Sequence, residues 1–275
     1  MSGAGAPLGL IAGNGRFPFL VAAAARRRGR KVVAVAIREE TSPELAGEVD
    51  EIEWVSLGQL GRCIAALKGG GVSEAVMAGQ VQHRQLFSGI VPDARLLGLL
   101  ARLAFKNTDS LIGAVADVLE KEGIRLLPST SLLEDQLATP GAMTRRTPSR
   151  QARRDMAYGR RVARTLAGLD LGQTVVIKDQ AAVALEAMEG TDEVIRRAGR
   201  IAGPGTTVVK LAKPGQDMRF DVPVVGLGTL EAMGAAGAAT LAVEAGRTLL
   251  LERERLLGLA EGQGIVVWGL SGDEP

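Results

Sequence analysis

The chain has 275 residues, of which 46% are hydrophobic, a length that suits one large domain or two of medium size. A formal charge of +2, one cysteine (Cys63) and one histidine (His83) exclude an internal disulfide framework and argue against a zinc site or a Ser-His or Cys-His nucleophile. The chain lacks an apolar run of about 18 residues that would span a bilayer and a basic secretory leader, so we expect a cytoplasmic protein.

The first half of the chain alternates short apolar runs with helix-like segments. Strands that alternate with helices form a mostly parallel sheet with helices on both faces, so we predict a Rossmann-like α/β domain over residues 1–133. The predicted strands are 8–13, 31–37, 49–56, 74–81 and 124–129, and the predicted helices are 19–29, 57–71, 94–105 and 109–123.

The second half is again α/β, but with a different connectivity. Residues 134–150 contain two prolines and no clear periodicity, which indicates an interdomain linker. Segments 174–179 and 182–188 are typical of paired neighbouring strands, so we predict a mixed sheet in a C-terminal catalytic α/β domain, residues 151–275. Its other predicted elements are helices at about 151–167, 190–199, 229–237 and 253–264 and strands at 206–213, 248–252 and 265–270.

Two glycine-containing turns follow predicted strands of the first half. Gly13, Asn14 and Gly15 precede the first helix, where backbone N–H groups can bind phosphate, although the sequence lacks a GxGxxG fingerprint and an ordinary tight turn explains the same pattern. Gly79 and Gln80 lie at the end of the fourth strand, the edge at which open parallel sheets bind ligands. His83 in the same loop is interpreted as a surface residue or a substrate contact.

Acidic residues mark two further positions. Asp109 begins a predicted helix, where a cap is the ordinary explanation. Glu186, Glu189 and Asp192 surround the end of a strand and the start of a helix for which Thr191 is the predicted N-cap. Both surface solubility and ligation of a hard cation explain three acids at this spacing, and the sequence leaves these alternatives open.

The stretch KPGQDMRFDVPVVG, residues 213–226, is the strongest local signal. It combines Lys213, Gln216, Asp217, Arg219 and Asp221 with the apolar residues Phe220 and Val222. Phosphoryl-transfer sites need this mixture, because cations neutralise developing oxygen charge and carboxylates hold a metal or orient a nucleophile. A surface salt-bridge cluster is the alternative, and the apolar neighbours argue for a partly buried loop instead.

Seven segments together resemble a known enzyme family. In chain order they are GLIAGNGRFP, AGQVQHR, KNTDSL, LDLGQTVVIKD, LEAMEGTDEVIRRAG, KPGQDMRFDVPVVGLGT and LAVEAGRTLLLE. They resemble the two-domain bacterial UDP-2,3-diacylglucosamine pyrophosphatases of lipid A biosynthesis, a family unrelated in fold to the calcineurin-like enzymes that catalyse the same step. The resemblance runs from about residue 8 to residue 270.

This resemblance implies Mg²⁺-dependent hydrolysis, with Mn²⁺ as an alternative metal, of UDP-2,3-diacylglucosamine to UMP and 2,3-diacylglucosamine 1-phosphate. It places the key acid at Asp221, and we assign Asp217, Lys213 and Arg219 to the same catalytic loop. Asp192 and Glu186 are the other expected metal ligands. The expected substrate-binding residues are Gly13, Asn14, Gly15, Gly79, Gln80, Asp109, Ser110, Glu189, Gly190, Thr191 and Gln216.

A cluster of arginines indicates which kinds of partner the protein could bind. From Arg145 to Arg164 there are eight arginines and one acid, Asp155. A solvated basic helix explains this run, and so does weak attraction to anionic headgroups on the cytoplasmic face of the inner membrane. Only Tyr158 interrupts the run as an aromatic, which argues against nucleic acid as a partner. A homodimer is the default oligomeric expectation.

Two other function classes stay open at this point. The strand–turn–helix around Gly13, with Glu39 and Glu40 after the second strand, permits a nicotinamide-dependent oxidoreductase. The arginine run permits a non-enzymatic protein that binds RNA or membranes.

Overall fold

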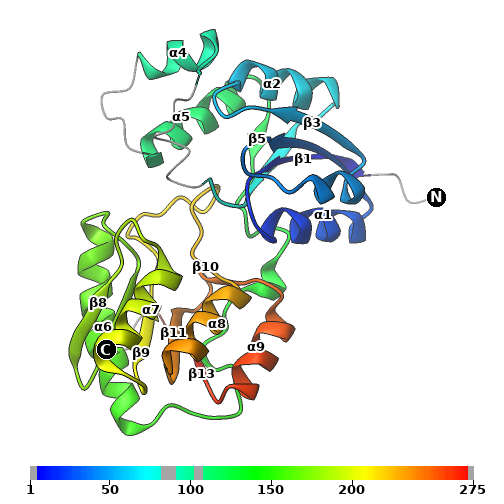
Figure 1. Ribbon diagram of the computed structural model, residues 1–275. Coiled ribbons are helices and arrows are strands. Elements are labelled where there is room, and N and C mark those ends of the chain that lie inside the picture. The colour runs from blue at the N-terminus through cyan, green and yellow to red at the C-terminus, as the bar shows by residue number, and fades with distance from the viewer. Residues whose placement is uncertain (1–4, 82–90, 102–107, 272–275) are drawn as a thin grey trace. The chain divides into compact units, whose positions relative to one another are not determined.

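The computed structural model describes residues 5–81, 91–101 and 108–271, and the chain forms two compact units (Figure 1). Unit 1 contains Met1–Leu133 and Asp217–Asp221, and unit 2 contains Glu134–Gln216 and Val222–Pro275. A short segment from the second half of the sequence is therefore part of the first unit. Within the described ranges, no helix is both long enough and apolar enough to cross a membrane.

Unit 1 is built on a five-stranded sheet in the order β3-β2-β1-β4-β5. Every pairing in it is parallel, with Leu10 of β1 opposite Ala34 of β2 and Val76 of β4. This is the strand order of a Rossmann-like half, so the predicted fold class of the first domain is confirmed. The strands are β1 (Gly5–Ala12), β2 (Arg30–Ile37), β3 (Glu51–Val55), β4 (Glu74–Ala78) and β5 (Arg125–Leu126).

Helices cover both faces of this sheet. Val33 and Val35 of β2 point to one face and pack with buried residues of α2 and α5, while the alternate residues Ala34 and Ala36 point to the other face. The helices are α1 (Phe17–Arg27), α2 (Leu60–Gly69), α4 (Ala94–Leu100) and α5 (Thr108–Lys121), with a 3₁₀ turn η1 (Pro43–Glu48). Helix α1 begins earlier than the sequence predicts, with a proline in its first turn, where the missing N–H costs nothing.

Unit 2 contains a mixed six-stranded sheet in the order β6-β13-β11-β9-β7-β8. β9, β11 and β13 are parallel to one another, whereas β6 and β7 run antiparallel to their neighbours, so the predicted mixed sheet is confirmed. The strands are β6 (Gly141–Ala142), β7 (Thr174–Lys178), β8 (Ala181–Leu185), β9 (Thr207–Lys210), β11 (Thr240–Glu244) and β13 (Val266–Leu270); β10 (Val224–Val225) and β12 (Leu249–Leu250) form a separate pair.

The two faces of this sheet bury different helices. Val176, Val208 and Val243 pack against α7, α8 and α9, whereas Val209 and Ile177 pack against α6. The helices are α6 (Arg150–Gly168), α7 (Thr191–Ala202), α8 (Leu227–Ala236) and α9 (Arg253–Gly262), with a 3₁₀ turn η2 (Glu134–Gln136). Alternation along each strand therefore divides the core into two layers.

The structure departs from the predicted elements in four places. β11 is a central strand that the sequence analysis missed, because its apolar run is short and follows the end of a helix directly. The predicted strand 248–252 is reduced to β12, and 124–129 is reduced to β5. Residues 134–150, interpreted as a linker, lie in unit 2, where Gly141 and Ala142 pair with β13.

Candidate functional site

One edge of the unit 2 sheet gathers polar side chains. β8, β9 and β11 end at this edge and β7 begins there, because β7 runs antiparallel to both of its neighbours. Glu186 follows β8 directly, Lys210 is the last residue of β9 and Glu244 is the last residue of β11. The carboxyl ends of parallel strands are the usual ligand-binding edge of an open α/β sheet.

A buried hydrogen-bond network lies at this edge. The Glu186 Oε1 atom accepts a hydrogen bond of 2.8 Å from the Thr191 hydroxyl, and Glu186 Oε2 accepts one of 3.0 Å from the Gln173 backbone N–H. The Lys210 ammonium donates to the Thr191 hydroxyl at 2.8 Å. Glu186 and Lys210 are 8% and 9% exposed, so this network joins two buried charged residues through one hydroxyl.

The first turns of α7 and α8 meet at the same place. Gly190, with φ 83°, is the N-cap of α7, and Thr191, which the sequence predicts as the cap, is the first helical residue. The correction has a physical reason: the Thr191 hydroxyl is used by Glu186 and Lys210 instead of by the helix backbone. The next residue, Asp192, accepts a hydrogen bond of 2.8 Å from Thr229 in α8.

Glu189 is held apart from this network by its own partners. Its carboxylate accepts hydrogen bonds from Arg197, at 2.5 Å, and from the Ala187 backbone N–H, at 3.0 Å. Burial works to raise the pKa of Glu189, but the backbone donors and Arg197 outweigh burial and lower it. Glu189 is therefore a paired carboxylate at the start of the β8–α7 connection.

Lys213 and Gln216 lie on the chain that leaves β9. Lys213 Nζ pairs with Asp170 Oδ1 at 2.6 Å, and its backbone N–H donates to the Gln216 side-chain oxygen at 2.7 Å. Asp170 has a left-handed backbone (φ 56°), a conformation that aspartate tolerates better than most residues. The α6–β7 loop thus helps to fix the first charged residue of the stretch 213–226.

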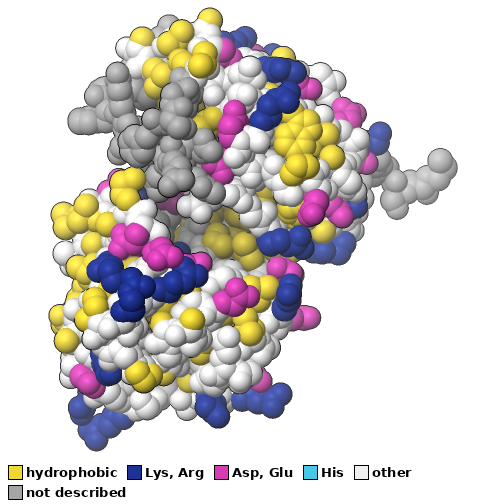
Figure 2. Space-filling view, viewed as in Figure 1, with side chains coloured by type: hydrophobic (Ala, Val, Ile, Leu, Met, Phe, Trp, Pro, Cys, Tyr) yellow, Lys and Arg dark blue, Asp and Glu magenta, His cyan; other side chains and the backbone are white. Residues whose placement is uncertain are grey.

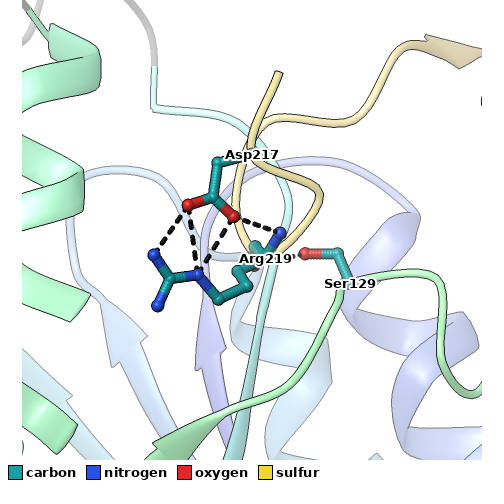
Figure 3. A network of polar contacts seen from close by, with 3 residues as sticks. All are labelled: Ser129, Asp217 and Arg219. Atoms are coloured by element: carbon teal, nitrogen blue, oxygen red, sulfur yellow. Dashed lines mark hydrogen bonds and ion pairs between the residues drawn. The ribbon is translucent and has the colours of Figure 1, made fainter. Parts of the chain in front are cut away.

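Asp217 and Arg219 of the same stretch pair with each other within unit 1 (Figure 3). Arg219 Nε lies 3.0 and 3.1 Å from the two Asp217 carboxylate oxygens, and Arg219 Nη2 lies 2.7 Å from Oδ2. The hydrogen bond from Arg219 lowers the pKa of Asp217, and that same bond raises the pKa of Arg219. Both residues are charged at neutral pH, and each is the other's main partner.

Ser129 connects the segment Asp217–Asp221 to the rest of unit 1 by hydrogen bonds. Its hydroxyl lies 2.8 Å from the Arg219 carbonyl oxygen and 2.7 Å from the Met77 carbonyl oxygen at the end of β4. The Ser129 backbone N–H donates to the Met218 carbonyl oxygen at 2.8 Å, and Phe220 packs against the core of unit 1. Asp221, whose N–H donates to the Asp217 carbonyl oxygen at 2.9 Å, closes the turn.

The two glycine-containing turns of unit 1 lie side by side. Asn14 and Gln80 form a short antiparallel bridge, with hydrogen bonds of 2.8 and 3.3 Å between their backbones. A Cβ atom at Gly79 would lie 2.6 Å from the Asn14 oxygen, and one at Gly13 would lie 2.8 Å from the Gln80 oxygen. Close packing of two backbones therefore requires both glycines. Gly15, with φ 86°, faces open space.

The predicted site residues fall into two groups. Unit 1 holds Gly13, Asn14, Gly15, Gly79, Gln80, Ser110, Asp217, Arg219 and Asp221, and unit 2 holds Glu186, Glu189, Gly190, Thr191, Asp192, Lys213 and Gln216. Glu186, Thr191 and Asp192 are brought together, as are Asp217, Arg219 and Asp221. His83 and the Asp109 side chain lie outside the part that the structure describes.

The expected metal ligands can be compared with this geometry. Among the described residues, no three His, Cys, Asp or Glu side chains gather in a group that could hold a metal. Glu186 and Asp192 already accept hydrogen bonds in unit 2, while Asp221 belongs to unit 1. The three expected ligands therefore do not form one preassembled carboxylate cluster within the described residues.

Sequence reasoning missed four residues that shape these groups: Lys210, Thr229, Asp170 and Ser129. Lys210 carried a readable signal, because a lysine that ends an apolar strand lies at the ligand-binding edge of the sheet. The other three are ordinary loop or helix-start residues, and only their tertiary contacts distinguish them.

Fold and site together define a two-unit α/β protein with a Rossmann-like sheet, a mixed sheet and a charged segment shared between the units. The family models described as the LpxI N-terminal domain and the LpxI C-terminal domain match residues 7–136 and 139–268. A curated relative, the UDP-2,3-diacylglucosamine pyrophosphatase LpxI of Caulobacter vibrioides, is 32% identical over 97% of this chain and 98% of its own length. The chain belongs to the LpxI family.

Proposed function

We propose that this protein hydrolyses the pyrophosphate bond of UDP-2,3-diacylglucosamine and releases UMP and 2,3-diacylglucosamine 1-phosphate. The observation that carries the proposal is the 32% identity to the named pyrophosphatase over almost the whole of both chains. In the proposed reaction a water oxygen attacks the α-phosphorus of the UDP moiety, and the bond from that phosphorus to the bridging oxygen breaks. The departing group is the acylated sugar phosphate.

The charged stretch 213–221 is the proposed catalytic loop. Asp221 orients the attacking water or contributes an oxygen ligand to Mg²⁺. Lys213 and Arg219 neutralise charge on the phosphate oxygens, and Arg219 uses Nη1 because Asp217 takes its Nε and Nη2. Asp217 then acts by holding Arg219, which differs from the direct metal or water contact that the sequence suggested.

Mg²⁺, with Mn²⁺ as an alternative, is the proposed cofactor. Asp221 is the principal proposed ligand, and Glu186 and Asp192 would need to release their present hydrogen-bond donors to take part. The chemistry expected of the bound cation is polarisation of the phosphoryl oxygens.

We further propose a cytoplasmic homodimer that contacts the inner membrane through α6. Arg153, Arg154 and Arg161 are exposed along this helix, and Leu169 and Leu171 after its end are 65% and 57% exposed. Basic and apolar side chains together favour an anionic lipid surface. Arg160 does not contribute, because it is buried and donates to the Ser271 carbonyl oxygen.

The other function classes are not favoured. Membership of the LpxI family and the name of the relative support a hydrolase over a nicotinamide-dependent oxidoreductase. The same two findings also favour a hydrolase over a non-enzymatic protein that binds RNA or membranes through its arginines.

The test is UMP release from UDP-2,3-diacylglucosamine, followed by ³¹P NMR with Mg²⁺, with Mn²⁺ and with EDTA. We expect metal-dependent release by the wild type and loss of most of the rate in Asp221→Asn. The matched control is Glu51→Gln, which removes an exposed carboxylate of unit 1 and leaves the rate unchanged. Absence of UMP under every metal condition would overturn the proposed reaction.

A further inference from the structure

Lys210 is a buried cation with too few acceptors. A protonated lysine carries three N–H donors, and burying donors without acceptors is unfavourable. Lys210 is 9% exposed, and its bond to the Thr191 hydroxyl is the only hydrogen bond of the ammonium within the described part of the chain. No carboxylate among the described residues pairs with it directly.

Glu186 compensates this charge only in part. The Thr191 hydroxyl donates to Glu186 and accepts from Lys210, so it separates the carboxylate from the ammonium. The second Glu186 oxygen is taken by the Gln173 N–H. The Glu186 carboxylate therefore lowers the electrostatic cost of burying Lys210. It supplies no acceptor for the other two ammonium protons of Lys210.

A second lysine of the same sheet shows the usual solution. Lys178 ends β7 at the opposite edge, and its ammonium donates to the carbonyl oxygens of Ala202, at 2.6 Å, and Pro204, at 3.0 Å. The two lysines therefore differ in their hydrogen-bond acceptors. The described chain supplies two carbonyl oxygens to Lys178 and a single hydroxyl to Lys210.

Further unmatched donors lie on two other segments of unit 2. Gln216, on the chain that continues from β9, has a buried side-chain nitrogen for which the described residues supply no hydrogen-bond acceptor. Helix α8 begins Gly226-Leu227-Gly228-Thr229 directly after β10, with no side-chain cap and no acid in its first turn. The Thr229–Asp192 hydrogen bond ties this turn to the residue next to Thr191.

The first turn of α7, unlike that of α8, contains acidic residues. It contains Asp192 and Glu193, and Figure 2 shows Lys and Arg side chains beside Asp and Glu side chains over this helix. Arg196 pairs with Glu193 and Arg197 pairs with Glu189, both at 2.5 Å. Arg196 and Arg197 thus neutralise Glu193 and Glu189, whereas the Asp192 carboxylate accepts from Thr229 of the α8 turn. What Lys210 and the α8 turn leave over is an excess of hydrogen-bond donors.

We propose that Lys210 and the N-terminal turn of α8 form a phosphate subsite. The ligand class is a phosphate monoester or its parent anion, and naming UMP as that ligand rests on the proposed function. Two ammonium protons of Lys210 and the N–H groups of Gly226, Leu227 and Gly228 donate to phosphate oxygens, as helix N-termini do in other phosphate sites. The Thr229 N–H is used within the turn, where it donates to the Gly226 carbonyl oxygen at 3.1 Å.

The test is calorimetric binding of UMP, inorganic phosphate and uridine to the full chain at constant ionic strength. For Lys210→Met we expect at least about tenfold weaker binding of UMP and of phosphate, because charge-assisted bonds are lost. Lys178→Met is the matched control and keeps wild-type affinities. Unchanged UMP and phosphate affinities in Lys210→Met would overturn the proposal.

A second pair of variants keeps the test independent of the lysine. Gly226 has an extended backbone and open space around its Cβ position, so Gly226→Asp and Gly226→Asn both give a favourable helix cap. The aspartate adds a negative charge at the subsite, and we expect it to bind UMP at least about tenfold more weakly than the asparagine variant does. Equal affinities would remove the α8 turn from the subsite.

These measurements do not depend on turnover. If the protein binds phosphate through Lys210 but releases no UMP from the proposed substrate, the subsite stands and the proposed reaction fails. If it releases UMP and the Lys210→Met variant binds UMP as the wild type does, the reaction stands and the subsite fails.

Discussion

The Ser129 hydroxyl lies 2.8 Å from the Arg219 carbonyl oxygen, although the two residues are 90 positions apart in the sequence. Ser129 is 1% exposed, and its hydroxyl also faces the Met77 carbonyl oxygen at 2.7 Å. One buried serine therefore connects the end of a sheet strand with the charged segment Asp217–Asp221.

Ser129→Ala is expected to lower the free energy of unfolding by about 1–3 kcal/mol, because the one hydroxyl proton that the Met77 and Arg219 carbonyl oxygens share is lost. Urea denaturation measures this change. Ser131→Ala is the control, since the buried Ser131 hydroxyl has no hydrogen-bond partner in the described part of the chain and its removal should change stability by less than about 0.5 kcal/mol. Equal effects of the two substitutions would contradict the role given to Ser129.

Asp217→Asn is expected to destabilise the protein at neutral pH and to do so less in acid. The pKa of Asp217 is lowered in the folded state from an ordinary value of 3.8, so its contribution is complete well above pH 3.8 and disappears as pH falls through the lower folded value. The effect should stay below about 1 kcal/mol, because the side chain is 34% exposed. Urea denaturation of both proteins at pH 7 and pH 3 checks this, and a difference that grows in acid would refute it.

Asp170→Asn should lower kcat/KM for UMP release by about two- to fivefold, because the Lys213 ammonium loses the carboxylate oxygen that lies 2.6 Å away. Asparagine keeps the left-handed backbone that Asp170 adopts, so stability should change little. Asp179→Asn is the matched control: Asp179 is also left-handed, with φ 51°, and is exposed at the β7–β8 turn. A similar loss in both variants would argue against a positioning role for Asp170.

Gly159→Ala should destabilise unit 2 by about 1–3 kcal/mol, because overpacking forces side chains off their preferred rotamers. Its Cβ would lie 2.7 Å from Val209 Cγ2 and 2.9 Å from Ile177 Cγ1, where α6 packs on the sheet. At the other end of the helix, a Cβ at Gly168 meets nothing within 4 Å, so Gly168→Ala should be neutral or slightly stabilising. Guanidinium denaturation compares the two, and a stable Gly159→Ala would contradict this packing.

Cys63 should resist thiol reagents in the native protein. Burial raises the pKa of its thiol to about 12, so almost no thiolate exists at pH 8, and the thiolate is the reactive form. Reaction with Ellman's reagent should be slow in buffer and complete in guanidinium, and the single cysteine makes the stoichiometry unambiguous. Rapid stoichiometric reaction of the native protein would show that α2 opens readily.

Much of the fold follows from local patterns. The alternation of apolar strands and helices predicts both sheets, and the parallel order of unit 1 agrees with it. Strand β11 was not predicted, because Thr240–Glu244 contains only a short apolar run. The strand is buried on both faces, so its sequence lacks the alternation of polar and apolar residues that marks a strand with one exposed face.

The candidate site was less accessible to sequence reasoning. The charges at Lys213–Asp221 are visible in the sequence, but their partners are not: Asp217 and Arg219 satisfy each other, and Lys213 pairs with Asp170. Lys210 becomes notable only when its burial and its single acceptor are known. Hydrogen-bond partners depend on tertiary contacts, which residue spacing alone does not encode.

The membership of Asp217–Asp221 in unit 1 limits how this chain can be divided. A fragment that ends at Leu133 would deprive the Ser129 N–H of its acceptor, the Met218 carbonyl oxygen, and its core would lack Phe220. A chimera of two related proteins that is joined near residue 134 meets the same constraint. It would pack the segment 217–221 of one parent into unit 1 of the other parent. The segment Asp217–Asp221 thus belongs to the second half of the chain in sequence and to the first unit in space, so neither unit is encoded by one continuous stretch.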